Sequence, residues 1–200
     1  YGTDINLPGL LHGRVLRSPH AHARIISIDT SKAESLPGVF AIVIANDLPE
    51  ADDRTEKAGE STINYKFLRD NNLASDKVLY VGHAVAVLAA RTPDVAQNAL
   101  ELIEVEYEIL EPVLDVRTAM SDETQVLHEQ IRTDGPNGNG DHPSNIAQHI
   151  RHTKGDPEKG FANADIIVER EFKTVPVHQS YLEPHAATAV WGMDGTLTIY

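Results

Sequence analysis

The stretch that decides the fold is AVAVLAARTPDVAQNALELIEVEYEI, residues 84–109. It begins with an apolar run, which predicts a strand buried on both faces. Thr92 can then N-cap a helix that begins at Pro93 and ends at Ile103. Over residues 104–109 glutamates alternate with apolar side chains, the pattern of a strand with one face in solvent. Strands alternating with a helix predict a mixed α/β layer fold.

The predicted helix has a broad apolar face that should pack on the sheet. Its two adjoining stripes are Val95, Ala99 and Leu102, and Ala96, Leu100 and Ile103. If the Leu102 side chain is buried, Leu102→Ala should cost about 2–5 kcal/mol.

Upstream of this stretch the patterns predict further strands at 10–17, 24–29, 39–44 and 77–81. The run at 39–44 is continuously apolar and predicts another buried strand. Residues 46–75 are polar and poorly patterned, so we expect a long excursion with little regular structure.

Downstream, patterns predict strands at 145–153 and 166–175 and a helix at 157–162, with Asp156 as its N-cap. A hairpin should join 186–191 to 196–200.

We expect one domain over residues 1–120, a linker over 121–143 and a second domain over 144–200. The second piece is small for an independent core, so we expect the chain to be a fragment of a longer protein.

Composition excludes several classes of function. The formal net charge of -13 argues against binding to nucleic acid or to an anionic membrane surface. No apolar run approaches the ~20 residues of a membrane helix, and the start has no signal pattern. We expect a cytoplasmic protein, with the periplasm left open.

The absence of cysteine excludes disulfides, thiolate zinc sites and iron–sulfur ligation within this chain.

The most unusual segment is VHQSYLEPH, residues 177–185, which carries many polar side chains in a short span. The amide of Gln179 can both donate and accept hydrogen bonds, so it could contact a ligand. The alternative is that it hydrogen-bonds neighbouring backbone groups. Glu183 could be a general base, but we favour a structural role in capping or pairing. His178 and His185 lack a recognised metal spacing, so we expect buried, hydrogen-bonded histidines.

Other candidate sites have ordinary explanations. His20 and His22 should share one strand face, which is compatible with metal binding, but no third ligand is evident and packing is favoured. The glycine-rich loop at 134–141 lacks the Lys-Ser/Thr of a phosphate loop, so we interpret it as a linker. The row of Glu104, Glu106 and Glu108 should be a solvated strand face.

Ordered motifs resemble one family, the molybdopterin-binding large subunits of the xanthine dehydrogenase and aldehyde oxidase type. The motifs are YGTDI at 1–5, LPGLLHG at 7–13, RSPHAHARI at 17–25, LPGV at 36–39, VGHAVA at 81–86, IEVEYE at 103–108, VLHE at 126–129 and 177–185. Ala84 replaces the proline of the family's Gly-x-Pro-Val-Ala pattern. The resemblance implies a hammerhead-like mixed sheet with packed helices, then a truncated, β-rich α+β segment of the molybdopterin-binding domain.

The resemblance also implies an activity for the intact protein. Family members oxidise a small-molecule substrate, an aldehyde or an N-heterocycle, with water as the oxygen source and a molybdopterin-type molybdenum cofactor. Iron–sulfur clusters and FAD or another acceptor lie on partner domains or subunits, and we expect an oligomer. Gln179 corresponds to the glutamine near the molybdenum oxo group, while His178, Tyr181, Glu183 and His185 are structural near the site. No complete catalytic set lies in this chain, so we expect it to be inactive and to bind no cofactor by itself.

Two alternatives remain open. The chain could be a non-catalytic α/β module that docks an iron–sulfur or flavin redox partner. More weakly, its ten histidines could bind metal. The substrate and the electron acceptor are not determined by these residues.

Overall fold

Residues 84–109 form the strand, helix and strand that their pattern predicts. In the computed structural model, β7 (Ala84–Ala90) is followed by α3 (Pro93–Glu101) and β8 (Glu104–Ile109). Thr92 Oγ1 accepts a hydrogen bond from the Val95 N–H at 3.2 Å, which confirms the predicted N-cap. The structure describes residues 4–52, 54–59, 61–129, 132, 142–147, 149–182 and 185–200.

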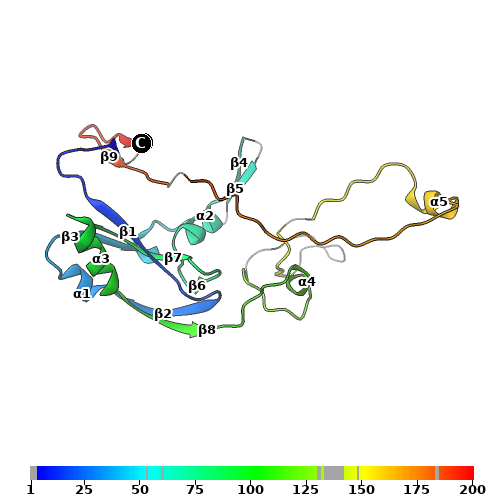
Figure 1. Cartoon of the computed structure of the whole chain (residues 1–200), viewed down its shortest axis with the longest axis horizontal. Helices are drawn as coiled ribbons and strands as arrows, with labels where there is room; N and C mark the ends of the chain where they lie inside the picture. Colours follow the sequence, from blue (N-terminus) through cyan, green and yellow to red (C-terminus); the bar gives the residue numbers. More distant parts are fainter. Residues whose placement is uncertain are drawn as a thin grey trace. The chain divides into compact units, whose positions relative to one another are not determined.

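The first sheet places β7 between β1 (His12–Arg17) and β3 (Val39–Ile44), with both pairings antiparallel. Helix α3 packs against all three strands, and the short helix α1 (Ser31–Glu34) packs against α3 and β3 (Figure 1). The central strand is buried as predicted, because it has neighbours on both edges and the helix on one face.

Strand β3 differs from its prediction as a buried strand. It is the last strand of the first sheet, and Phe40 is 58% exposed. The Arg91 guanidinium lies 5.8 Å from the centroid of the Phe40 ring. An apolar run alone does not distinguish a central strand from an edge strand, because only the pairing order decides which strand is covered.

The second sheet has the order β6-β2-β8, in which β2 (Ala23–Asp29) is central and pairs antiparallel with β8 and with the two-residue strand β6 (Lys77–Val78). The three glutamates of β8 are exposed, which confirms the solvated face. The predicted strand at 77–81 is shorter because a turn follows it, with Gly82 at φ 90°.

The buried stripe of α3 is shifted by one position from the first stripe predicted. Ala96 and Ala99 are fully buried, and Ile103 is 8% exposed. Leu102 is only half-buried, because the helix ends at Glu101 and Leu102 is its C-cap. The core of this sheet is therefore built on Ala96, Ala99 and Ile103.

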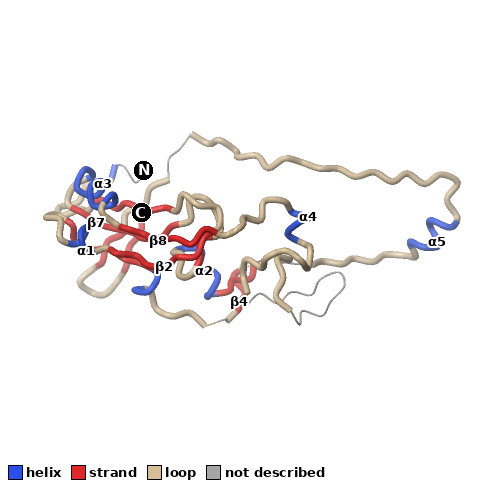
Figure 2. Tube along the Cα trace, turned by 90° about the horizontal axis from the view of Figure 1, so that it is seen from below, coloured by secondary structure: helices blue, strands red, loops and turns tan. Residues whose placement is uncertain are grey.

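The expectation of a long irregular excursion over 46–75 is wrong. This region contains a 3-10 turn, η2 (Ala45–Asp47), a hairpin of β4 (Thr55–Ala58) and β5 (Ser61–Asn64), and α2 (Tyr65–Asn72). Asn64 N-caps α2, since its Oδ1 accepts from the Phe67 N–H at 3.1 Å. Figure 2 shows the helical turn of α2 close to β4. Polar side chains hide this regularity because α2 has no fully buried residue.

In the second half, the predicted helix is present in full, and the two strands of the predicted hairpin are present in shorter form. Asp156 caps α5 (Pro157–Ala162) as predicted, with its Oδ1 accepting from the Lys159 N–H at 3.0 Å. The predicted hairpin is formed by β9 (Ala189–Trp191) and β10 (Leu197–Ile199). A short helix, α4 (Val116–Ala119), lies next to the predicted linker.

The strands predicted at 145–153 and 166–175 are wrong for the described part of the chain. Both segments run without strand assignment, and the apolar side chains of Ile166 and Phe172 are 81% and 87% exposed. A strand is defined by ladder hydrogen bonds to a neighbour, and neither segment forms a ladder with another described segment. A hydrophobic pattern alone does not determine whether a segment has a neighbouring strand to pair with.

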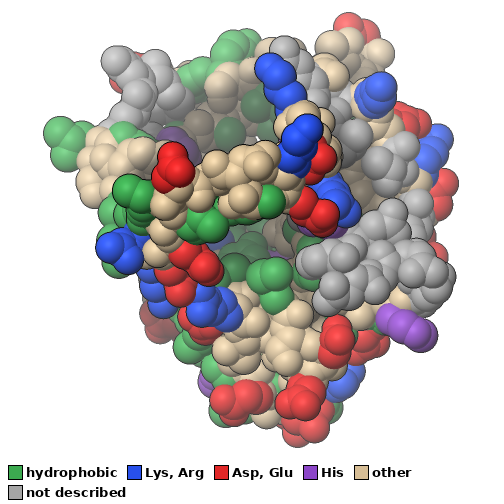
Figure 3. Space-filling view, turned by 90° about the vertical axis from the view of Figure 1, so that its right-hand side faces the viewer, with side chains coloured by type: hydrophobic (Ala, Val, Ile, Leu, Met, Phe, Trp, Pro, Cys, Tyr) green, Lys and Arg blue, Asp and Glu red, His purple; other side chains and the backbone are tan. Residues whose placement is uncertain are grey.

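Residue contacts divide the chain into two units, Pro8–Gln148 and a second unit of Tyr1–Leu7 with His149–Tyr200. The boundaries that we expect at residues 120 and 143 stay a prediction. On the face in Figure 3, acidic side chains lie among basic ones, and hydrophobic side chains reach the surface. In the described residues, no helix combines the length and the apolarity needed to cross a membrane.

Candidate functional site

The segment at 177–185 is extended and exposed where it is described, and it has one unusual backbone position. Ser180 has φ 55°, in the left-handed region that non-glycine residues seldom adopt. Its N–H donates to His178 Nδ1 at 2.9 Å. Because a backbone N–H only donates, His178 Nδ1 is an acceptor, and the proton of the neutral ring is on Nε2. Backbone strain of this kind is concentrated at functional sites.

Three of the predicted site residues are brought together by their rings. The centroids of His178 and Tyr181 are 5.4 Å apart with a tilt of 39°. Tyr181 stacks on His185 at 5.0 Å and 17°. These contacts link both ends of the segment. The histidines are exposed here, so the expectation of buried histidines is wrong within this chain.

Gln179 stands outside this ring arrangement and has an exposed side chain. Its neighbours on either side are fixed by the His178–Ser180 contact, so the amide is presented by a locally ordered backbone. Glu183 and Pro184 lie outside the described residues, and the role that we expect for Glu183 stays a prediction.

The predicted pair of His20 and His22 is not on a strand. Both residues lie in the loop between β1 and β2. The His20 ring contacts the Tyr107 ring edge-on at 5.0 Å. His22 is 2% exposed and its Nδ1 donates to the Glu111 carbonyl oxygen at 2.8 Å. The strand ends at Arg17 because Pro19 follows, so alternation no longer sets the side-chain directions.

In the described part of the chain, no group of three or more His, Asp or Glu side chains could hold a metal ion. The glycine-rich loop at 134–141 lies outside the described residues. Its expected role as a linker stays a prediction.

The structure also contains a cavity that the sequence did not indicate. It has a volume of about 90 Å³ and lies in the unit of residues 8–148. Its lining comes from α2, the segment around β6 and residues 127–129: Lys66, Phe67, Asp70, Ser75, Asp76, Lys77, Leu79, His83, Leu127, His128 and Glu129. These positions are far apart in the sequence. The motifs at 81–86 and 126–129 contain His83, Leu127, His128 and Glu129, but nothing in either motif indicated that the two segments meet.

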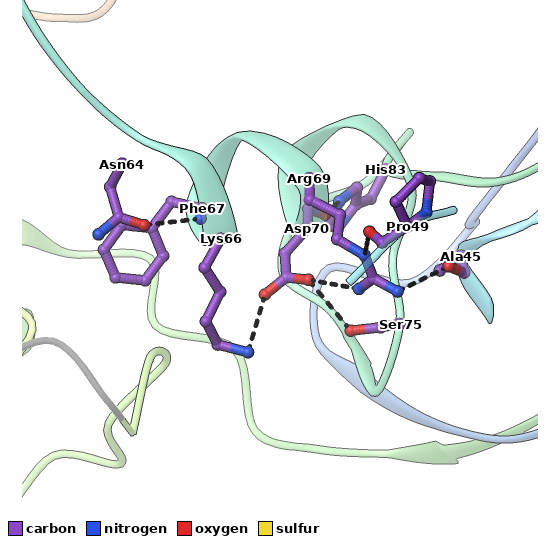
Figure 4. Close-up of polar contacts among 9 residues, drawn as sticks. All are labelled: Ala45, Pro49, Asn64, Lys66, Phe67, Arg69, Asp70, Ser75 and His83. Carbon is purple, nitrogen blue, oxygen red and sulfur yellow. Dashed lines mark hydrogen bonds and ion pairs between the residues drawn. The ribbon is translucent and has the colours of Figure 1, made fainter. Parts of the chain in front are cut away.

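Lys66, Asp70 and Ser75 line one side of this cavity, and Figure 4 shows the polar contacts that Asp70 makes with Lys66, Arg69 and Ser75. Asp70 accepts from Arg69 at 3.3 Å and from the Ser75 hydroxyl at 3.4 Å, and Lys66 Nζ lies 3.9 Å from its second oxygen. Desolvation by burial lowers the pKa of His83, and the Asp70 carbonyl opposes that shift. In this cluster the Asp70 carboxylate is thus paired with the cationic side chains of Lys66 and Arg69.

Comparison with known proteins relates both halves of the chain to one enzyme family. Residues 1–111 match the aldehyde oxidase and xanthine dehydrogenase a/b hammerhead domain, and residues 139–200 match the molybdopterin cofactor-binding domain. The chain is 36% identical over 200 residues to a probable xanthine dehydrogenase subunit of Bacillus subtilis (strain 168), covering 100% of the chain and 24% of that protein. It is 31% identical over 199 residues to the nicotinate dehydrogenase large molybdopterin subunit of Eubacterium barkeri, covering 100% of the chain and 42% of that protein.

Solved structures agree with this relationship. A Cu,Mo carbon monoxide dehydrogenase in its carbon monoxide-reduced state matches with a TM-score of 0.78 and 35% identity, over 100% of this chain and 25% of that chain. The aldehyde oxidoreductase of Desulfovibrio gigas matches in fold with a TM-score of 0.72 at 23% identity, over 100% of this chain and 21% of that chain. The family match covers more than half of the chain, and the mixed α/β fold agrees with it. The chain therefore belongs to the aldehyde oxidase and xanthine dehydrogenase family.

Proposed function

We propose that this chain is part of the molybdopterin-binding large subunit of a molybdenum hydroxylase. The intact protein would oxidise an aldehyde or an N-heterocycle with water as the oxygen source. The observation that carries this proposal is the order of the two matches, with the hammerhead domain at 1–111 followed by the molybdopterin cofactor-binding domain at 139–200. The chain spans 24% and 42% of the two curated relatives described above.

The residues at 177–185 fit a role beside such a cofactor. The bound cofactor would supply the two-electron oxidation and the activation of water. Gln179 would donate its amide N–H to an oxo group, because it is exposed and neutral. His178, Tyr181 and His185 would hold the backbone on both sides of that amide through the contacts of their rings. Oriented neutral donors of this kind stabilise charge as it develops in a transition state.

We also propose that iron–sulfur and flavin partners accept the electrons. A supporting observation is that relatives are named as subunits, including subunit gamma of the 6-hydroxypseudooxynicotine dehydrogenase complex of Paenarthrobacter nicotinovorans. The chain has no cysteine, so thiolate-bound clusters would have to lie elsewhere.

The test is Gln179→Ala in the intact protein, purified with its partners. We expect kcat to fall by about 10- to 1,000-fold while the molybdenum content stays near that of the wild type. The matched control is Gln97→Ala, which removes the same amide from the exposed side of α3, where Gln97 donates to Glu101 at 3.2 Å. This control should leave kcat and metal content unchanged.

Two results would contradict the proposal in different ways. Wild-type turnover by Gln179→Ala with full metal content would remove Gln179 from the site. An intact protein that contains no molybdenum and no pterin would instead favour the non-catalytic module that docks a redox partner.

A further inference from the structure

Residues 125–129, here called the latch, lie on the wall formed by α2 and β6. The His128 ring meets the Phe67 ring edge-on, with centroids 5.4 Å apart and planes at 65°. Leu127, His128 and Glu129 all line the cavity described above. The latch thus closes one side of this cavity, although it is far in sequence from the other walls.

Three hydrogen bonds hold the latch, one on the C-terminal side of His128 and two on the N-terminal side. Glu129 accepts from Lys77 Nζ at 3.1 Å, and the Lys77 side chain is only 12% exposed. On the other side, the Leu127 N–H donates to Asn145 Oδ1 at 2.8 Å, while Asn145 Nδ2 donates to the Gln125 carbonyl at 3.0 Å. Leu127 lines the cavity and its N–H is bonded to Asn145, so exchange of this amide follows the loss of the arrangement around the latch.

The pocket around His128 disfavours a charged imidazole. Burial lowers the pKa of His128, and the Lys77 ammonium lowers it further, whereas Asp70 opposes the shift. The charged and titratable groups that line this pocket are Lys66 and Asp70 from α2, Asp76 and Lys77 from the segment of β6, His83 before β7, and Glu129 from the latch itself.

We propose that residues 125–129 form a pH-sensitive latch, docked while His128 is neutral and released when His128 is protonated. The sign follows from linkage: a group whose pKa is lower in the docked state binds protons preferentially in the released state. Docking is complete above the ordinary histidine pKa of 6.5 and weakens as the pH falls below it.

The position of the latch in the chain suggests what its release would do. Residues 125–129 lie between the segments that match the hammerhead domain, 1–111, and the molybdopterin cofactor-binding domain, 139–200. Release would open the cavity and detach residues 127–129 from α2 and β6. This inference does not depend on the proposed catalytic activity.

The experiment is hydrogen exchange of the intact protein at about pH 8 and about pH 5.5, corrected for the intrinsic pH dependence of exchange. In the wild type, protection of the Leu127 amide should fall by roughly threefold to tenfold on acidification. His128→Phe should keep Leu127 protected at both pH values, because Phe retains the ring contact with Phe67 and does not titrate. The matched control His149→Phe, at an exposed histidine, should behave as the wild type.

His128→Gln gives a second check, because it removes the titration and the aromatic ring together. We expect lower protection of Leu127 at both pH values, with a smaller change between them than in the wild type. Full pH dependence retained in His128→Phe would assign the effect to His83 or another group and overturn the proposal. Wild-type protection that does not change with pH would also overturn it.

Discussion

His83 joins α2 to the turn before β7 by donating from Nε2 to the Asp70 carbonyl oxygen at 2.9 Å. Its other nitrogen, Nδ1, accepts from the Leu79 N–H at 3.3 Å. Because a carbonyl only accepts and a backbone N–H only donates, the ring is neutral with its proton on Nε2. The side chain is 1% exposed and stacks on Tyr80 with centroids 4.4 Å apart.

This arrangement predicts that the unit of residues 8–148 loses stability in acid. Burial lowers the pKa of His83 in the folded state below the ordinary 6.5. The unfolded state therefore binds more protons over that interval, so the stability that His83 contributes is full above about pH 6.5 and is lost as the pH falls toward the folded pKa. Hydrogen exchange of the β7 amides in the intact protein, measured between about pH 8 and about pH 5, would reveal it.

Replacing His83 by Gln should change both the level and the pH dependence of this stability. Gln can donate to the Asp70 carbonyl but does not reproduce the acceptor for Leu79, so we expect a loss of about 1–3 kcal/mol at neutral pH. The acid sensitivity should become smaller but not vanish, because the pKa of His128 is lowered as well. An unchanged pH profile in His83→Gln would contradict the assignment.

The packing of α3 predicts different costs for two adjacent truncations. Ile103 is 8% exposed and belongs to the core, so Ile103→Ala should destabilise the unit by about 2–5 kcal/mol. Leu102 is half-buried at the helix C-cap, so Leu102→Ala should cost less than the lower end of that range. Protection of the β7 amides against exchange in the two variants measures the difference. If the two variants lost equal stability, the helix would pack on the sheet through the stripe that contains Leu102.

Arg69 fastens the region before β4 to α2 (Figure 4). Its Nη2 donates to the Ala45 carbonyl at 2.8 Å and its Nε donates to the Pro49 carbonyl at 3.1 Å. Arg69→Lys keeps the charge but loses the paired hydrogen bonds of the guanidinium. We therefore expect local stability to fall by about 1–3 kcal/mol, which can be measured as faster proteolysis of residues 45–64. The control is Arg54→Lys at an exposed ion pair with Glu56, which should change little. Equal proteolysis rates for both variants would rule out the proposed role of Arg69.

The 200-residue chain by itself should hold no molybdenum, pterin or flavin in stoichiometric amount. Cofactor sites are concave and bury most of their ligand, whereas the segment at 177–182 is exposed throughout in this chain. Metal analysis and the fluorescence of oxidised pterin, applied to the purified chain, measure this directly. Stoichiometric molybdenum would contradict the prediction.

Sequence patterns were sufficient where local chemistry decides the structure. The apolar run of β7 and the N-caps Thr92 and Asp156 are correct, because a strand core and a helix start depend on neighbouring residues. The patterns failed at β3 and at 166–175, because an edge position or a missing ladder depends on residues far away.

For the site, the residue types of 177–185 were visible in the sequence, but their contacts were not. The stack of Tyr181 on His185 and the left-handed backbone of Ser180 are results of the fold.

The sequence by itself determined the α/β class, the exclusion of thiolate chemistry and the segment that presents Gln179. These properties follow from composition and from patterns within a few residues. Only the tertiary structure decided that His83 is held neutral by Asp70 and Leu79, and that His128 docks beside Phe67. The reason is physical: desolvation and hydrogen-bond geometry act through space, and they join α2 to residues that lie well beyond it in the sequence.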